Sequence, residues 1–119
     1  MIVEVDAANP TPPYEQIRTQ IETMIATGVL APGSHLPSIR QLAGDLGLAV
    51  NTVARSYREL ETHGFVITRV RSGTTVAPRR PTMTPAETQR RLTEAAKTYL
   101  TTARVLGMSI DDAIAALRS

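Results

Sequence analysis

The sequence predicts a mainly α-helical protein with one small β-hairpin, an α+β fold in which a helical N-terminal domain precedes two further helices. Three observations support this prediction. Apolar residues recur at helical spacing over most of the 119-residue chain. Two short β-branched runs flank Arg71-Ser72-Gly73, and Gly or Pro residues separate the segments. We expect a domain over residues 1–78, a linker over 79–84 and a helical tail over 85–119.

The composition predicts a soluble globular protein. Apolar residues make up 42% of the chain and charged residues 20%, which argues against intrinsic disorder. The absence of cysteine excludes disulfides. No apolar run approaches the roughly 18 residues of a membrane span, and the N-terminus lacks the pattern of a signal peptide. We therefore expect a cytoplasmic protein with no membrane partner. The net charge of +2 and the pI of about 9.5 are compatible with nucleic-acid binding without demonstrating it.

The N-terminal segment is predicted to lead into a first helix. Residues 1–6 alternate apolar and polar side chains, which predicts a short strand or an extended arm. A helix is expected from Tyr14, with Ile17 and Ile21 on its apolar side, and Gly28 is expected to end it.

Residues 36–64 are predicted to form two helices joined by a tight turn. Ser38 can cap the first helix, and Gln41 three residues later completes a capping box. Gly47 can leave the helix with a positive φ angle. The second helix is expected from about Val50 to His63.

The second helix is predicted to present polar side chains opposite its buried face. On a helical wheel Tyr57 and Leu60 lie within about 40° of Val53, and the three form the buried face. The opposite face and its flank carry groups suited to base edges and phosphates, namely Asn51, Thr52, Arg55 and Arg58. Taken alone, this pattern is explained equally well by an ordinary solvated face.

The β-hairpin supplies further basic residues. Arg69 and Arg71 lie at or near its tip, beside Gly73. In isolation the hairpin would be explained equally well by solvated arginines. Its position directly after a helix-turn-helix favours a wing that contacts the DNA backbone or the minor groove.

The tail is predicted to contain two helices, capped by Thr84 and Ser109. Packing on the N-terminal domain could cover their apolar faces. We favour a second copy of the chain, because two DNA-binding heads gain affinity and site length. The predicted dimer contact consists of Leu92, Ala96, Tyr99, Ala103, Leu106, Ile110, Ile114 and Leu117.

These motifs resemble the GntR family of bacterial winged helix-turn-helix transcription regulators. The similarity covers most of residues 10–78 and includes Pro13-Tyr14-Glu15-Gln16-Ile17, Leu36-Pro37-Ser38, Asn51-Thr52-Val53 and Ser72-Gly73-Thr74. The short helical tail is similar to that of the YtrA-like subfamily. The resemblance implies a homodimer that represses an operon, typically one encoding an ABC transporter. Together with the basic residues above, it implies DNA contacts from Ser38, Arg40, Asn51, Thr52, Arg55, Arg58, Arg69, Arg71 and Gly73.

Three positions depart from the family pattern. Ala49 stands where many relatives have Ser or Thr, so the second helix lacks a side-chain cap worth about 1 kcal/mol. Val50 replaces a residue that is often polar or basic, which removes a base contact. Arg71 replaces a frequent wing-tip glycine. These departures leave the resemblance to the family intact, but the family pattern does not predict the sequence of the double-stranded DNA operator.

Catalysis is not expected. The only histidines, His35 and His63, lie in a turn and at a helix end, and we predict no metal and no cofactor. Two alternatives are a winged helix that only contacts proteins and the DNA-binding head of a MocR-like regulator. The predicted last helix, Ser109–Leu117, argues against a head followed by a long linker. A small-molecule effector, if one exists, is expected at the junction of linker and tail.

Overall fold

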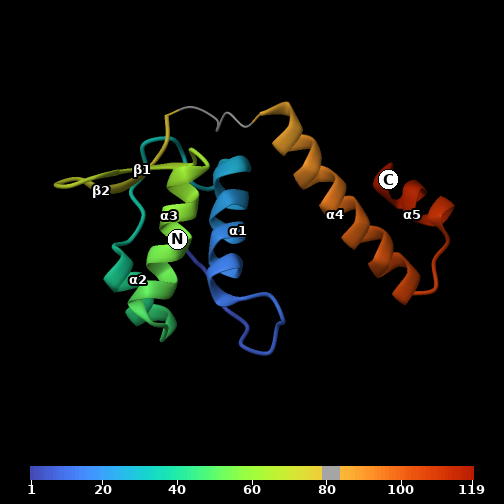
Figure 1. Ribbon diagram of the computed structural model, residues 1–119, viewed down its shortest axis with the longest axis horizontal. Coiled ribbons are helices and arrows are strands. Elements are labelled where there is room, and N and C mark those ends of the chain that lie inside the picture. Colours follow the sequence, from blue (N-terminus) through green and yellow to red (C-terminus); the bar gives the residue numbers. More distant parts are fainter. Residues whose placement is uncertain (79–83) are drawn as a thin grey trace. The chain divides into compact units, whose positions relative to one another are not determined.

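The computed structural model describes residues 1–78 and 84–119, which belong to two compact units, Met1–Thr82 and Met83–Ser119. The N-terminal unit contains α1 (Pro13–Ala26), α2 (Ile39–Leu46), α3 (Val50–Thr62), β1 (Val66–Arg69) and β2 (Gly73–Val76), and the C-terminal unit contains α4 (Pro85–Val105) and α5 (Ile110–Leu117) (Figure 1). The predicted mainly helical fold with a small β-wing is confirmed. Except for Thr84, the predicted linker lies outside the described residues. None of the described helices is both long and apolar enough to cross a bilayer.

Helix α3 is at the centre of the N-terminal unit. It contacts α1 and α2, and Figure 1 shows α1 and α3 running side by side. Val53 and Leu60 of α3 are completely buried, as are Ile17 and Ile21 of α1. Burial of each such side chain stabilises the fold by roughly 1.5–3 kcal/mol. Tyr57 is also buried, so the predicted inner face of the helix is confirmed.

The helix ends follow local signals in the sequence. Ser38 caps α2, and its Oγ accepts a hydrogen bond from the Gln41 N–H at 3.1 Å. Gly47 ends α2 in the left-handed region, with φ of 66°, where an L side chain would be strained. Ala49 precedes α3 without a side-chain cap, as predicted.

The hairpin is extended by a segment that was not predicted. Strands β1 and β2 pair antiparallel as expected, but His35 also forms an isolated bridge to Thr75 of β2. The Leu36 N–H donates to the Thr74 carbonyl at 2.9 Å in the same ladder. The residues that lead into α2 therefore hydrogen-bond to β2 and fix the wing against the rest of the N-terminal unit.

The N-terminal residues form an extended arm and no strand, which settles the alternatives left open by the sequence. Val3 is buried, and two glutamine amides of α1 hydrogen-bond the backbone of the arm. Gln20 bonds both the N–H and the carbonyl of Glu4, at 3.0 and 2.7 Å. Gln16 does the same at Asp6, at 2.9 and 3.0 Å. The amides thus satisfy backbone groups that a β-partner would otherwise bind.

The C-terminal unit consists of α4 and α5 in contact with each other. Ser109 and Asp112 form a complete capping box at the start of α5. The Tyr99 hydroxyl donates to the Ala113 carbonyl at 2.6 Å, and both Ala103 and Ala113 are buried. Small residues therefore lie where the two helices approach.

Candidate nucleic-acid interface

Helix α3 is fixed by a hydrogen bond to the segment that leads into α2. The Tyr57 hydroxyl donates to the Pro37 carbonyl at 2.7 Å. Burial raises the pKa of the Tyr57 phenol well above its ordinary value, because the charged form loses its hydration. The phenol therefore keeps its proton and remains a donor at neutral pH.

A second hydrogen bond fixes α3 to the beginning of α1. Ser56 is completely buried, and its Oγ donates to the Tyr14 carbonyl at 2.7 Å. The two residues are 42 positions apart in the sequence, so no local pattern predicted the contact. With Tyr57 bonded to one neighbouring segment and Ser56 to another, the rotation of α3 about its axis is determined.

All nine residues predicted to contact DNA lie in the N-terminal unit. Eight are exposed, and Thr52 is half-buried. Ser38 and Arg40 lie at the beginning of α2, and the wing carries Arg69, Arg71 and Gly73. The remaining four are Asn51, Thr52, Arg55 and Arg58 of α3.

Arg55 is exposed but already has partners within the protein. Its guanidinium carbon lies 3.7 Å from the centroid of the Tyr14 ring, a distance suited to a cation–π interaction. Its Nε is 3.4 Å from Glu59 Oε2, and the side chain keeps 56% of its exposure. The wheel correctly predicted an exposed arginine but gave no indication that it contacts α1.

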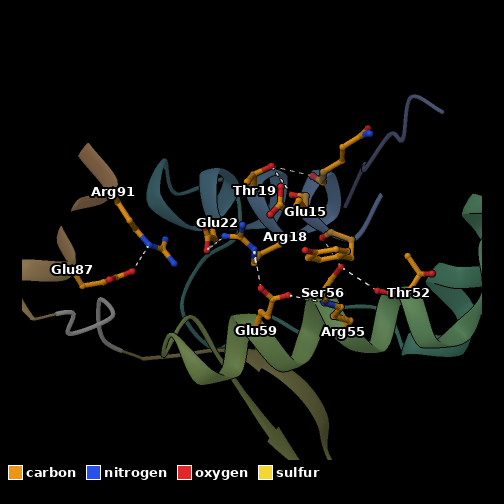
Figure 2. A network of polar contacts seen from close by, with 12 residues as sticks. Glu15, Arg18, Thr19, Glu22, Thr52, Arg55, Ser56, Glu59, Glu87 and Arg91 are labelled. Atoms are coloured by element: carbon orange, nitrogen blue, oxygen red, sulfur yellow. Dashed lines mark hydrogen bonds and ion pairs between the residues drawn. The ribbon is translucent and has the colours of Figure 1, made fainter. Parts of the chain in front are cut away.

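Glu59 continues this contact into a line of alternating charges between α3 and α1 (Figure 2). Its Oε1 lies 3.8 Å from Arg18 Nε, and Arg18 Nη1 hydrogen-bonds Glu22 Oε1 at 3.1 Å. Arg18 and Glu22 each retain only 15% of their side-chain exposure. The surrounding protein screens these charges less than water would, so the line contributes to the orientation of α3 against α1.

Helix α3 therefore has two different sides. Ser56 and Glu59 belong to the side that contacts α1. Val50, Ala54 and Arg58 follow at four-residue intervals along another side. On that side Arg58 is exposed, Val50 keeps 48% of its exposure and Ala54 is partly exposed. The departure from the family pattern at Val50 indicated a lost polar contact, but the exposure of this apolar side chain cannot be predicted from the sequence alone.

The C-terminal unit carries an apolar groove of about 440 Å³ between α4 and α5. Ala103 is buried, and Leu106 is 69% exposed and does not line the groove. The lining contains the other six predicted dimer residues and two that were not predicted, namely Leu92, Ala95, Ala96, Tyr99, Leu100, Ile110, Ile114 and Leu117.

No cluster of three His, Cys, Asp or Glu residues that could hold a metal occurs in the part of the chain that the structure describes. Apart from Gly73, the residues predicted to contact DNA instead carry arginine, amide and hydroxyl side chains on helices and a hairpin. These groups suit phosphates and base edges.

The chain matches the family described as bacterial regulatory proteins, gntR family, over residues 13–76. It is 43% identical to the HTH-type transcriptional regulator Rv1152 of Mycobacterium tuberculosis over 112 residues, which cover 94% of this chain and 88% of that protein. It is 37% identical to the HTH-type transcriptional repressor YtrA of Bacillus subtilis over 76 residues, which cover 64% of this chain and 58% of that protein.

The fold is also similar to the solved structure of YtrA from Sulfolobus acidocaldarius, a GntR-family transcription factor. The TM-score is 0.64 at 35% sequence identity, covering 82% of this chain and 99% of that one. The relatives are transcription regulators and not enzymes. The family match spans more than half of the chain and contains all of the helix-turn-helix and the wing. The chain therefore belongs to the GntR family of DNA-binding winged helix-turn-helix transcription regulators and is YtrA-like.

Proposed function

We propose that the protein is a homodimeric repressor that binds a twofold-symmetric DNA operator. The observation that carries this proposal is the combination of a DNA-binding head with an apolar groove in the tail. The related Bacillus subtilis protein is named a transcriptional repressor, which supports repression over activation.

On the DNA side, the proposal assigns each group a contact suited to its chemistry. Asn51 and Arg58 are exposed on α3 and would bind base edges in the major groove. Arg40 at the beginning of α2 would bind a phosphate. Arg69 and Arg71 would contact the backbone or minor groove from the wing.

Arg55 differs from the other arginine of α3 because its side chain already contacts Tyr14 and Glu59. We propose that it contributes positive charge at the interface while it remains stacked. Thr52 and Ser38 would donate hydroxyl hydrogen bonds to phosphates, and Gly73 would let the wing backbone approach the DNA.

On the dimer side, the groove supports a second copy of the chain as the partner. Leu92 and Leu117, which line it, are 65% and 69% exposed. Contiguous apolar surface of this kind marks association sites. An isologous contact in which both copies use the same groove would place two heads in a twofold arrangement, suited to two half-sites.

Repression would follow from occupancy, because a dimer bound over a promoter excludes RNA polymerase. The proposed target is an operon that encodes an ABC transporter. The protein would act on it in the cytoplasm. An effector at the junction of linker and tail would change the spacing of the heads. Most of that junction lies outside the described residues.

The test combines operator selection with a matched pair of tail variants. Sequences bound from a random duplex pool are expected to converge on a twofold-symmetric site, bound at least about a thousandfold more tightly than random DNA. Sedimentation at micromolar concentration should show a dimer. Leu92→Glu, in the groove, should give monomers with weakened operator binding. Val105→Glu, on the same helix, exposed, outside the groove lining and outside the predicted dimer contact, should leave the dimer intact.

Two outcomes would contradict the proposal. A monomer both with and without DNA would exclude the dimer. Weak binding with a steep salt dependence and no consensus would indicate only a basic surface.

A further inference from the structure

Val50 is a large apolar side chain exposed at the first position of α3. It keeps 48% of its exposure, whereas Val53, Tyr57 and Leu60 of the same helix are buried. An isolated exposed valine is ordinary on a protein surface. This one begins the helix whose N-terminal residues contact bases in a helix-turn-helix protein, so its chemistry bears on which sequence is bound.

The contacts of α3 determine which of its sides is available to DNA. Ser56 is bonded to Tyr14 and Glu59 faces Arg18, so this side is occupied by α1. Val50 and Ala54 are one turn apart on the other side, and Arg58 follows one turn later. This side therefore presents a small apolar surface followed by a cation.

We propose that Val50 contacts the C5-methyl group of a thymine in the operator and is thus a specificity-determining residue of this chain. The methyl group is the apolar feature that distinguishes thymine at the edge of the major groove. A valine cannot hydrogen-bond to a base, but it can exclude water from a methyl group. Ala54 is small enough to admit the methyl and would line the same contact.

The neighbouring residue extends this prediction. Asn51 is exposed, and asparagine characteristically binds the N6 and N7 atoms of adenine. A valine and an asparagine at consecutive positions would therefore both favour A·T pairs. The selected half-site is expected to contain A·T pairs where the N-terminal turn of α3 enters the groove.

The inference rests on the proposed operator binding, and the test is designed to separate the two. Each thymine of the selected operator is replaced in turn by deoxyuridine, which lacks only the methyl group. The wild-type protein should lose about fourfold in affinity at one thymine per half-site, the value expected for removing one buried methyl. Val50→Ala should bind the thymine and deoxyuridine versions of that site equally well.

A matched variant controls for general effects of the substitution. Val29 is 70% exposed in the loop after α1, outside the helix-turn-helix. Val29→Ala removes the same two methyl groups and should retain the fourfold preference. Because Val50 is half-exposed, Val50→Ala is expected to fold normally, which an unchanged thermal melting curve would verify.

The outcomes distinguish the two proposals. If deoxyuridine weakens the wild type and Val50→Ala equally, another residue contacts the methyl and the inference is wrong. If specific binding is found but no thymine methyl contributes, the inference is likewise wrong while the repressor proposal stands. If no sequence-specific binding is found, the proposed function fails, and the assignment of Val50 fails with it.

Discussion

Replacing Tyr57 with Phe should destabilise the N-terminal unit through the loss of one buried hydrogen bond. The hydroxyl donates to the Pro37 carbonyl at 2.7 Å, and Tyr57 is 3% exposed. Phe preserves the ring but leaves the carbonyl without this donor. Removing one partner of a buried pair costs about 1–3 kcal/mol. Pro37 is only half-buried, so water can partly replace the donor and a loss of about 1–2 kcal/mol is expected.

Urea denaturation followed by circular dichroism measures this loss. With an m-value of about 1–3 kcal/mol/M, the midpoint should fall by roughly 0.3–2 M. Tyr14→Phe is the matched control, because the structure gives the Tyr14 hydroxyl no hydrogen bond among the described residues and the ring that stacks on Arg55 remains. An equal loss in both variants would refute the assigned role of the hydroxyl.

The pH dependence of stability gives an independent test of the same residue. Burial raises the pKa of Tyr57 in the folded state above the value of about 10 in the unfolded chain. The neutral phenol thus stabilises the fold fully below pH 10. Above pH 10 the unfolded state ionises first, and stability falls by up to about 1.4 kcal/mol per pH unit. The difference between wild type and Tyr57→Phe should therefore shrink above pH 10, and a difference independent of pH would contradict the burial argument.

Two further predictions concern the turn and the tail. Gly47→Ala should destabilise the fold by about 1 kcal/mol, because φ is 66° there although the added Cβ would meet no atom within 4 Å. Gly44→Ala, within α2 and equally unobstructed, should be neutral or stabilising by up to about 1 kcal/mol, and denaturant midpoints compare the two. In the tail, the hydrogen bond from Arg90 lowers the pKa of the Glu87 carboxyl to about 2. The Glu87 contribution to stability is therefore present above its unfolded pKa and lost as the pH falls through about 2. NMR titration of the carboxyl should show that midpoint, and a midpoint near 4 would contradict the ion pair.

The features that the sequence predicted well depend on short-range chemistry. The cap at Ser38, the left-handed turn at Gly47 and the capping box at Ser109 each involve residues within a few positions of one another. The buried face of α3 was equally predictable, because helical periodicity alone places Val53 and Leu60 together.

The features that could not be predicted join distant segments. Nothing near Ser56 indicates that its hydroxyl bonds a carbonyl 42 positions away. The bridge from His35 to Thr75 extends the sheet through a segment without strand-like patterning. A helical wheel placed Arg55 on the outside but could not say which ring lies beside it. For the same reason the wheel could not separate the side of α3 that packs against α1 from the side that stays exposed.

This division of α3 has a consequence for changing the DNA sequence that the protein binds. A combinatorial library that varies residues 50, 51, 54 and 58 would alter exposed or partly exposed positions only. The same library should keep Arg55, Ser56 and Glu59 constant, since these hold the helix against α1. During divergence of the family, substitutions at the varied positions could change the operator sequence that is bound, with little loss of folding stability. Substitutions at the three constant positions would first have to be compensated in α1.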